Sequence, residues 1–141
     1  MKTLVMFVAI AAVSAVQSDT APIAGSWIAQ FDSRTFVRLE LKTANGTITG
    51  GISLGNFEVD SQGAVRRADE SPRALTPIFD VTRRASILTF SRKDDASIDR
   101  FEVRLLDSGD VELKLLLDDE ELEEFAADGI PTPKPIHLTK R

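Results

Sequence analysis

Residues 25–31 read Gly-Ser-Trp-Ile-Ala-Gln-Phe, and this stretch decides the fold. It holds the only tryptophan of the chain, and its alternation places Trp27, Ala29 and Phe31 on one side of an extended backbone. A period of two residues is typical of a strand with one buried face. We therefore expect a first strand over residues 25–31 with the indole in the core.

The same alternation recurs along the chain and is clearest in residues 35–42, where Val37, Leu39 and Leu41 alternate with charged side chains. Asn45-Gly46 is a typical hairpin turn because both residues tolerate a positive φ. The further strands that we expect cover residues 47–54, 57–60, 78–82, 86–92, 98–106, 111–117 and 136–139.

Two segments break this pattern. Gly50-Gly51 lies inside the third expected strand, where it favours a sharp bend or a bulge. Residues 64–77 are polar and contain prolines, so we expect a surface loop there with at most one helical turn near Pro72.

After residue 117 the period changes from two to about 3.6. Asp118 is a good N-cap, and Glu121 completes a capping box with it. Leu122 and Phe125 then share one face, and Gly129 ends the helix. Three prolines follow before the last strand, so we expect one short amphipathic helix there.

These elements predict an all-β protein, namely an up-and-down antiparallel barrel of eight or nine strands with one short helix before the last strand. The pattern lacks long βαβ crossovers, which disfavours a parallel sheet. Closure of the last strand against the first removes exposed strand edges. A two-sheet sandwich is the alternative.

The N-terminus indicates export. Residues 1–15 combine Lys2, an apolar run and small residues at Ser14-Ala15, as in a cleaved signal peptide, and the run is too short to span a bilayer. Residues 16–24 read as a flexible lead-in, and residues 25–141 as the barrel domain. The expected location is the periplasm or the extracellular space, with no membrane span after cleavage. Since cysteine is absent, the core must stabilise the product without disulfides.

Charge narrows the class of partner. Cleavage would remove Lys2 from the 17 basic residues and none of the 22 acidic ones, which leaves a formal charge of −6. A nucleic-acid partner is therefore not expected. Ten acids and a single base, Lys114, lie between residues 105 and 128, so this acidic patch could meet a basic protein partner. The alternative is a rim that admits anionic ligands, since arginines concentrate in the middle loops at Arg66, Arg67, Arg73, Arg83 and Arg84.

A Gly-x-Trp motif at the start of the first strand resembles the calycin pattern of lipocalins and related small barrels; the chain is also similar to small exported bacterial barrels of unassigned function. The resemblance implies that Trp27 seals one end of the barrel and that a basic residue of the last strand packs across it. Gly25, Trp27 and Lys140, or Arg141 beside it, are the positions that match.

No catalytic or metal-binding constellation is expected, and no cofactor. His137 is the only histidine, and its position between Ile136 and Leu138 predicts that it faces solvent. A general base or a zinc site needs partners that the sequence does not supply.

The function that we expect is non-catalytic binding of a small apolar or amphiphilic ligand at the end of the barrel opposite Trp27. Large side chains could instead fill the interior, and a protein-interaction module or inhibitor that uses the acidic helix is the alternative function. The expected ligand-binding positions are Leu39, Leu54, Phe90, Phe101 and Val103.

Overall fold

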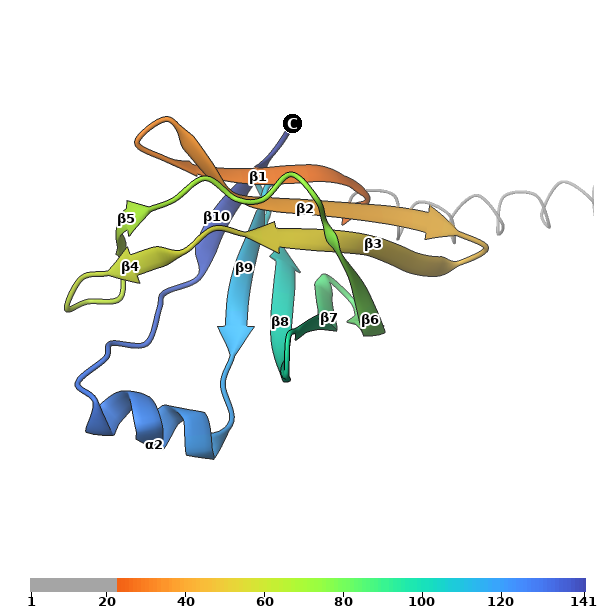
Figure 1. Cartoon of the computed structure of the whole chain (residues 1–141). Coiled ribbons are helices and arrows are strands. Elements are labelled where there is room, and N and C mark those ends of the chain that lie inside the picture. The colour runs from red at the N-terminus through yellow and green to blue at the C-terminus, as the bar shows by residue number, and fades with distance from the viewer. Residues whose placement is uncertain (1–22) are drawn as a thin grey trace, which may run out of the picture.

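The computed structural model describes residues 23–141, and their main feature is a closed antiparallel barrel (Figure 1). Its strands lie in the order β1-β10-β9-β8-β7-β6-β3-β2. Strands that follow one another along the chain are therefore neighbours in the barrel, and the last strand closes it against the first. The prediction of an up-and-down barrel with a helix before the last strand is confirmed. The eight strands are β1 (Gly25–Phe31), β2 (Arg34–Ala44), β3 (Thr47–Leu54), β6 (Thr76–Arg84), β7 (Ile87–Asp94), β8 (Ser97–Leu105), β9 (Val111–Leu116) and β10 (Ile136–Lys140).

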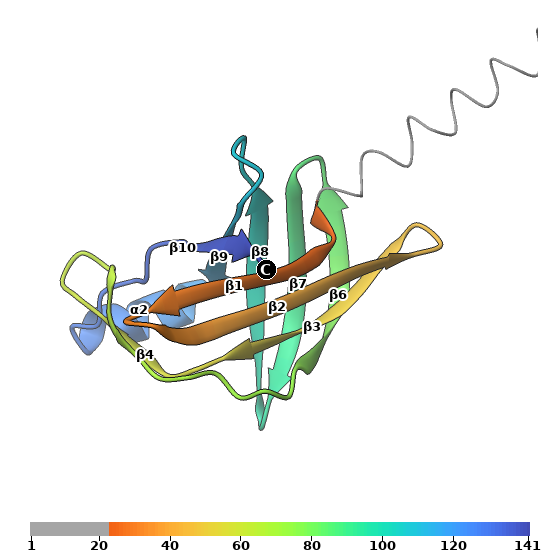
Figure 2. The ribbon, with the colours of Figure 1, turned by 90° about the horizontal axis from the view of Figure 1, so that it is seen from above.

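The barrel is flattened, and its two halves cross. Strands β1, β2 and β3 run over β6, β7 and β8 at a steep angle (Figure 2). Strands β7 and β8 pair along their whole lengths, whereas β3 and β6 are joined only at Gly51↔Pro77 and Ile52↔Thr76. Closure comes from β1 and β10, which pair at Trp27↔Lys140 and Ile28↔Thr139. The barrel therefore combines long ladders, such as β7–β8 and β2–β3, with two short seams at β3–β6 and β1–β10.

The core consists of the inward residues of the alternating strands. Trp27, Leu39, Phe90 and Val103 are all fully buried. Phe90 and Phe101 are cross-strand partners whose rings stack with centroids 5.6 Å apart. The other fully buried large side chains are Ile23, Val37, Leu41, Ile52, Leu88, Val111 and Leu138.

Gly50-Gly51 contains no bulge, which corrects the sequence-based expectation. The pairing of β2 and β3 runs without a register shift from Val37↔Leu54 to Ala44↔Thr47. The glycines instead allow other chain segments to approach closely. A Cβ on Gly50 would lie 1.8 Å from the carbonyl oxygen of Glu40, and one on Gly51 would lie 2.8 Å from Cβ of Leu75.

The chain between β3 and β6 leaves the barrel wall. It forms a separate two-stranded sheet from β4 (Phe57–Val59) and β5 (Val65–Ala68), which corrects the prediction of an irregular loop over residues 64–77. The four residues of β5 show no clear alternation of apolar and polar side chains, and the strand forms because it pairs with β4. The excursion lies beside one end of the barrel (Figure 1).

The predicted helix is α2 (Asp119–Ala127), and its capping box is confirmed. The backbone N–H of Glu121 donates to Asp118 Oδ1 at 2.8 Å, and Gly129, with φ of +68°, follows its C-cap. None of its residues is buried, and Leu122 is 41% exposed. Among residues 23–141, no helix has the length and apolar character that crossing a bilayer requires.

The predicted signal peptide, residues 1–15, lies outside the described residues, as does most of the expected lead-in over residues 16–24. Its residue Ile23 is described and is fully buried. The carbonyl oxygen of Ile23 accepts a hydrogen bond from Trp27 Nε1 at 3.0 Å. Ile23 is therefore part of the packed domain, which corrects the expectation of a flexible lead-in up to residue 24.

Candidate ligand-binding site

The end of the barrel at Trp27 is sealed. The indole is fully buried, and Nζ of Lys140 lies 5.3 Å from its ring centroid. A Cβ on Gly25 would lie 2.7 Å from Cε of Lys140, so the glycine leaves room for the lysine to cross the indole. The N–H of Arg141 donates to the carbonyl oxygen of Ser26 at 2.9 Å and holds the end of the chain in place. Gly25, Trp27 and Lys140 thus meet at one place.

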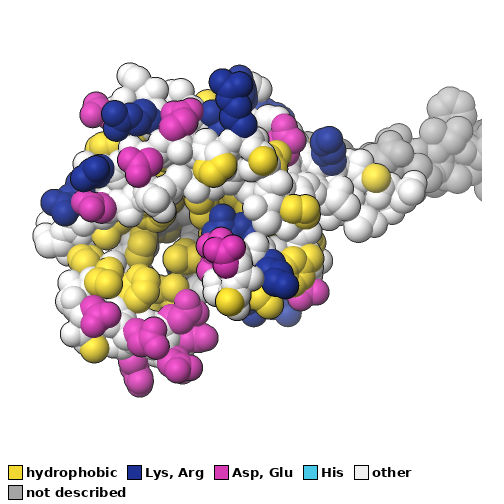
Figure 3. All heavy atoms as spheres, in the orientation of Figure 1, with side chains coloured by type: hydrophobic (Ala, Val, Ile, Leu, Met, Phe, Trp, Pro, Cys, Tyr) yellow, Lys and Arg dark blue, Asp and Glu magenta, His cyan; other side chains and the backbone are white. Residues whose placement is uncertain are grey.

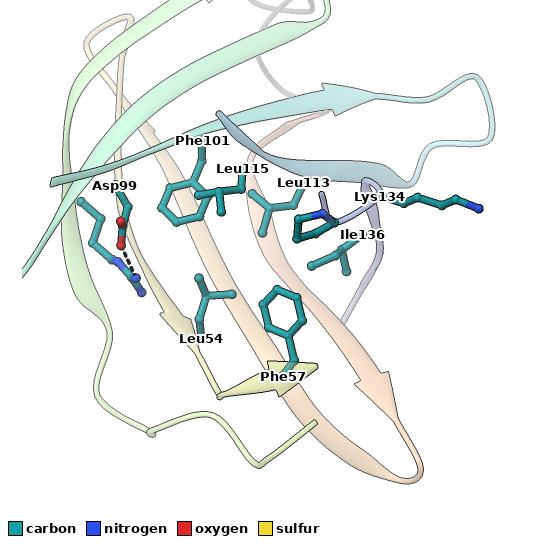
Figure 4. A pocket seen from close by; sticks show the side chains of 10 residues that line it. Leu54, Phe57, Asp99, Phe101, Leu113, Leu115, Lys134 and Ile136 are labelled. Carbon is teal, nitrogen blue, oxygen red and sulfur yellow. Dashed lines mark hydrogen bonds and ion pairs between the residues drawn. The ribbon is translucent and has the colours of Figure 1, made fainter. Parts of the chain in front are cut away.

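A pocket of about 120 Å³ lies at the opposite end. Antiparallel order brings the end of β3, the start of β8, the end of β9 and the start of β10 to this end of the barrel. In Figure 4, Phe101, Leu113 and Leu115 face Leu54 and Phe57 across the space. The remaining lining residues are Arg92, Asp99, Pro133, Lys134 and Ile136.

Phe57 reaches the pocket because the β4–β5 sheet is anchored to the barrel. Its ring packs against Phe36 with centroids 5.9 Å apart. Arg38 on β2 holds the following segment, with an ion pair of 2.9 Å to Glu70 and a hydrogen bond from its Nε to Ser71 Oγ at 3.0 Å. The N–H of Ser71 donates in turn to the carbonyl oxygen of Thr35. These contacts keep Phe57 in position as one wall of the pocket.

One wall of the pocket is an ion pair. Arg92 and Asp99 are cross-strand partners on β7 and β8, and Arg92 Nη2 lies 2.7 Å from Asp99 Oδ2. The guanidinium carbon lies 5.5 Å from the ring centroid of Phe101, and the Arg92 side chain is only 13% exposed. Its Nε is buried without a hydrogen-bond partner. An unpaired buried donor costs about 1–3 kcal/mol, so a ligand atom that paired with it would gain affinity.

Two wider recesses adjoin the pocket and share lining residues with it. One, of about 420 Å³, lies between β4 and the segment after α2 and is lined by Phe57, Arg66, Phe125 and Ile130 among others. The second, of about 460 Å³, lies beside the β3–β6 seam. Figure 3 shows the opening as a hollow lined by hydrophobic side chains, with a cluster of acidic side chains below it where Figure 1 places α2. The site is thus a narrow apolar pocket behind a broader, partly acidic mouth.

The structure divides the expected ligand-binding residues into two groups. Leu54 and Phe101 line the pocket. Leu39, Phe90 and Val103 are fully buried and pack in the core, away from the pocket wall. Inward alternation could identify all five as interior residues, but it could not say at which height along the barrel packing ends and the pocket begins.

The sequence analysis missed Phe57, Arg92 and Asp99. For the two charged residues a signal was present, because Arg92 is in phase with the inward Phe90, and Asp99 is in phase with the inward Phe101. Opposite charges at inward positions of neighbouring strands predict a buried pair. For Phe57 no such signal exists, because its position depends on how the β4–β5 sheet folds back.

The described part of the chain holds no group of three His, Asp or Glu side chains arranged to bind a metal ion. His137 is exposed, and its Nε2 lies 2.7 Å from Asp110 Oδ2. This pair lies beside the β8–β9 turn, since β10 pairs with β9 at His137↔Glu112. Neither His137 nor Asp110 lines the pocket, although Ile136, the neighbour of His137, does.

The pocket is thus defined by geometry: apolar walls from four barrel strands and β4, one embedded ion pair, and a sealed end at Trp27. Comparisons of the chain with protein-family models, with curated proteins and with solved structures found no match.

Proposed function

We propose that this protein is a non-catalytic binding barrel for a small apolar or amphiphilic molecule. The observation that carries the proposal is the pocket of about 120 Å³ at the end opposite Trp27, which is lined mainly by apolar side chains. Ligand sites are typically concave, largely apolar and supplied with a few polar groups that orient the ligand. Arg92 and Asp99 are such groups.

The size of the pocket suggests how a ligand would be held. An engineered apolar cavity of about 150 Å³ binds benzene, so the inner pocket suits one small ring or the end of an alkyl chain. Each buried CH₂ contributes about 0.8 kcal/mol. The wider recesses at the mouth leave room for a bulkier polar part. An amphiphile with its apolar end inward fits this shape.

Two further parts of the proposal concern family and location. The contact of Lys140 with Trp27, next to Gly25, supports a calycin-like barrel. The pattern of residues 1–15 supports export to the periplasm or the extracellular space. Both are consistent with a carrier or scavenger of apolar molecules.

The test fills the pocket with a larger side chain. In Leu54→Trp, the indole occupies the space between Phe57 and Phe101, and we expect loss of binding of N-phenyl-1-naphthylamine, an uncharged fluorescent probe. Leu122→Trp on α2 is the matched control, because it adds the same indole at an exposed site. The control should bind the probe as the wild type does.

Fluorescence titration of both variants decides the outcome, with thermal unfolding to show that each is folded. Equal probe affinity in Leu54→Trp and Leu122→Trp would place the probe elsewhere and contradict the proposal. Wild-type protein that neither binds the probe nor carries an apolar molecule in native mass spectrometry after isolation from its producing cells would also contradict it.

A second candidate function is supported by α2. Residues 118–128 contain seven acids, and within residues 23–141 none of them forms an ion pair. A charged helix with no buried residue is accessible to a basic protein partner, which could be a protein that this chain inhibits. Such a partner should dissociate as salt rises and should be lost when Glu120, Glu123 and Glu124 are changed to Gln, whereas an apolar ligand should be retained in both cases.

A further inference from the structure

We propose that the pocket selects amphiphiles whose head group is uncharged and accepts hydrogen bonds, and that it discriminates against carboxylates of the same chain length. This inference rests on the proposed binding function and specifies its ligand class. It follows from how the charges in and around the pocket are already paired.

The cation inside the pocket is neutralised. Arg92 contacts Asp99 at 2.7 Å, and a second carboxylate, Asp94, lies 3.8 Å from the same nitrogen. An incoming carboxylate would have to compete with two protein carboxylates for one guanidinium. If it failed, it would be buried without a partner, and burial of an unpaired charge is costly.

The other cations that line the opening also face acids. Arg66 at the mouth pairs with Glu58 at 3.1 Å. Lys134 extends away from the pocket in Figure 4. The pKa of Asp60 is lowered mainly by hydrogen bonds from the backbone N–H groups of Gln62 and Ala64. The positive charge of Lys134 lowers it further, so Lys134 lies near Asp60. Arg92 and Arg66 are thus already paired with acids, and Lys134 extends away from the pocket.

The electrostatic potential at the rim of the pocket also disfavours anionic ligands. The acidic side chains of α2 lie directly below the hollow in Figure 3. A negative rim repels an approaching anion and lowers its local concentration. Pairing within the pocket and repulsion at the rim thus both disfavour a fatty carboxylate.

An uncharged acceptor has a specific partner in the pocket. Nε of Arg92 is a buried donor with no hydrogen bond, on a side chain that forms part of the pocket wall. A small rotation of the guanidinium would present this N–H to a hydroxyl, ester or amide oxygen while Nη2 stays near Asp99. A quaternary ammonium head offers no acceptor for it.

The experiment compares three probes with the same ten-carbon chain: decan-1-ol, decanoate and decyltrimethylammonium. Isothermal titration calorimetry below the micelle concentrations at pH 7 measures their affinities for wild-type protein and for two variants. Asp99→Asn removes the main partner of Arg92 and preserves its shape. Asp107→Asn is the matched control, because it removes the same charge from the exposed β8–β9 turn at the other end of the barrel.

We expect wild-type protein to bind decanol about tenfold more tightly than decanoate, a difference of about 1.4 kcal/mol. Asp99→Asn should strengthen decanoate binding by a similar factor, and Asp107→Asn should leave the ratio unchanged. Decanoate or decyltrimethylammonium as the tightest wild-type ligand would overturn the inference. An unchanged ratio in Asp99→Asn would also overturn it.

The outcomes separate this inference from the proposed function. Equal affinity of wild-type protein for all three probes keeps a binding barrel and rejects the selectivity. Absence of binding to all three, together with absence of N-phenyl-1-naphthylamine binding, rejects the binding function, and the selectivity with it.

Discussion

Trp27 shows how one residue can close a barrel. Its indole is fully buried, donates to the carbonyl oxygen of Ile23 and lies under the ammonium group of Lys140. These contacts join the residue before β1 to the final strand through a single side chain. Burial of a large aromatic side chain dominates the energy of such a cluster, and the cation–π contact adds about 0.5–1 kcal/mol at an exposed lysine.

Trp27→Ala should therefore lower the free energy of unfolding by about 3–5 kcal/mol, because it leaves a cavity at the sealed end. Trp27→Phe should cost less, since a ring remains while the hydrogen bond to Ile23 is lost. Leu122→Ala on the exposed helix is the control, with a change below about 1 kcal/mol. Urea unfolding measures all three, and a similar loss in Trp27→Ala and Leu122→Ala would contradict a buried indole.

Arg92 and Asp99 are the two polar partners that line the apolar pocket. Both lie at inward positions near the open end, where an apolar pair could have filled the space. A buried ion pair adds little to stability compared with apolar packing, because desolvation opposes the attraction of the charges. We therefore propose that they contribute to ligand selectivity, which the Asp99→Asn comparison tests.

Among the elements, α2 is the one least attached to the fold. It contributes no buried residue, so its stability depends on its own ends: the capping box of Asp118 with Glu121 and the turn at Gly129. A helix of nine residues is marginal without tertiary packing. Its three acids in the first turn favour the helix through the dipole, but the last turn has no base.

Asp118→Ala should melt α2 without unfolding the barrel. Loss of an N-cap costs about 0.5–2 kcal/mol, which is enough to unfold a helix this short. Amide hydrogen exchange in α2 should rise, while the urea midpoint of the barrel stays unchanged. Asp118→Ser preserves the cap and should preserve amide protection. A shift of the global midpoint equal to the loss of helix stability would show that α2 is coupled to the core.

The β4–β5 sheet is the element that completes the site. Its strands are short and outside the barrel, yet they carry Phe57 to the pocket and the Arg66–Glu58 pair to the mouth. The ion pair of Arg38 with Glu70 and its hydrogen bond to Ser71 attach the segment after this sheet to the barrel wall. Long connections in compact domains often serve function, and this one forms one wall of the pocket.

At the scale of the whole molecule, the barrel is uneven in strength. Strands β7 and β8 pair from end to end, whereas β3 meets β6 only at two positions. The β3–β6 seam also borders one of the outer recesses. The β1–β10 seam also pairs at only two positions, but the hydrogen bond from the Arg141 N–H to Ser26 and the contact of Lys140 with Trp27 reinforce it. Local opening follows the weakest pairing, so the β3–β6 seam is where the barrel should open first.

Native-state hydrogen exchange tests this order of opening. Amides of β3 that bond to β6 should exchange at least about tenfold faster than those in the centre of the β7–β8 ladder, because fewer bonds must break. A ligand in the pocket should slow exchange at the seam. Uniform protection around the barrel would show that it opens only by global unfolding.

The meeting of Trp27 with the last strand was expected from the resemblance to calycin barrels. The residue pattern by itself determined the barrel, its strand ends to within a few residues and the capped helix. It could do so because these features depend on local alternation, turn chemistry and capping, which act over short distances along the chain. The inward phase of Arg92 and Asp99 follows from the same alternation.

The tertiary structure alone decided where the interior is packed and where it is hollow. Leu39, Phe90 and Val103 have the same inward phase as residues of the pocket wall, but they lie at a height where side chains from all around the barrel meet. Phe57 enters the wall only because the β4–β5 sheet folds back, and the β5 strand exists only through its pairing with β4. Pairing and packing between distant segments set these features, and alternation along one strand carries no information about them.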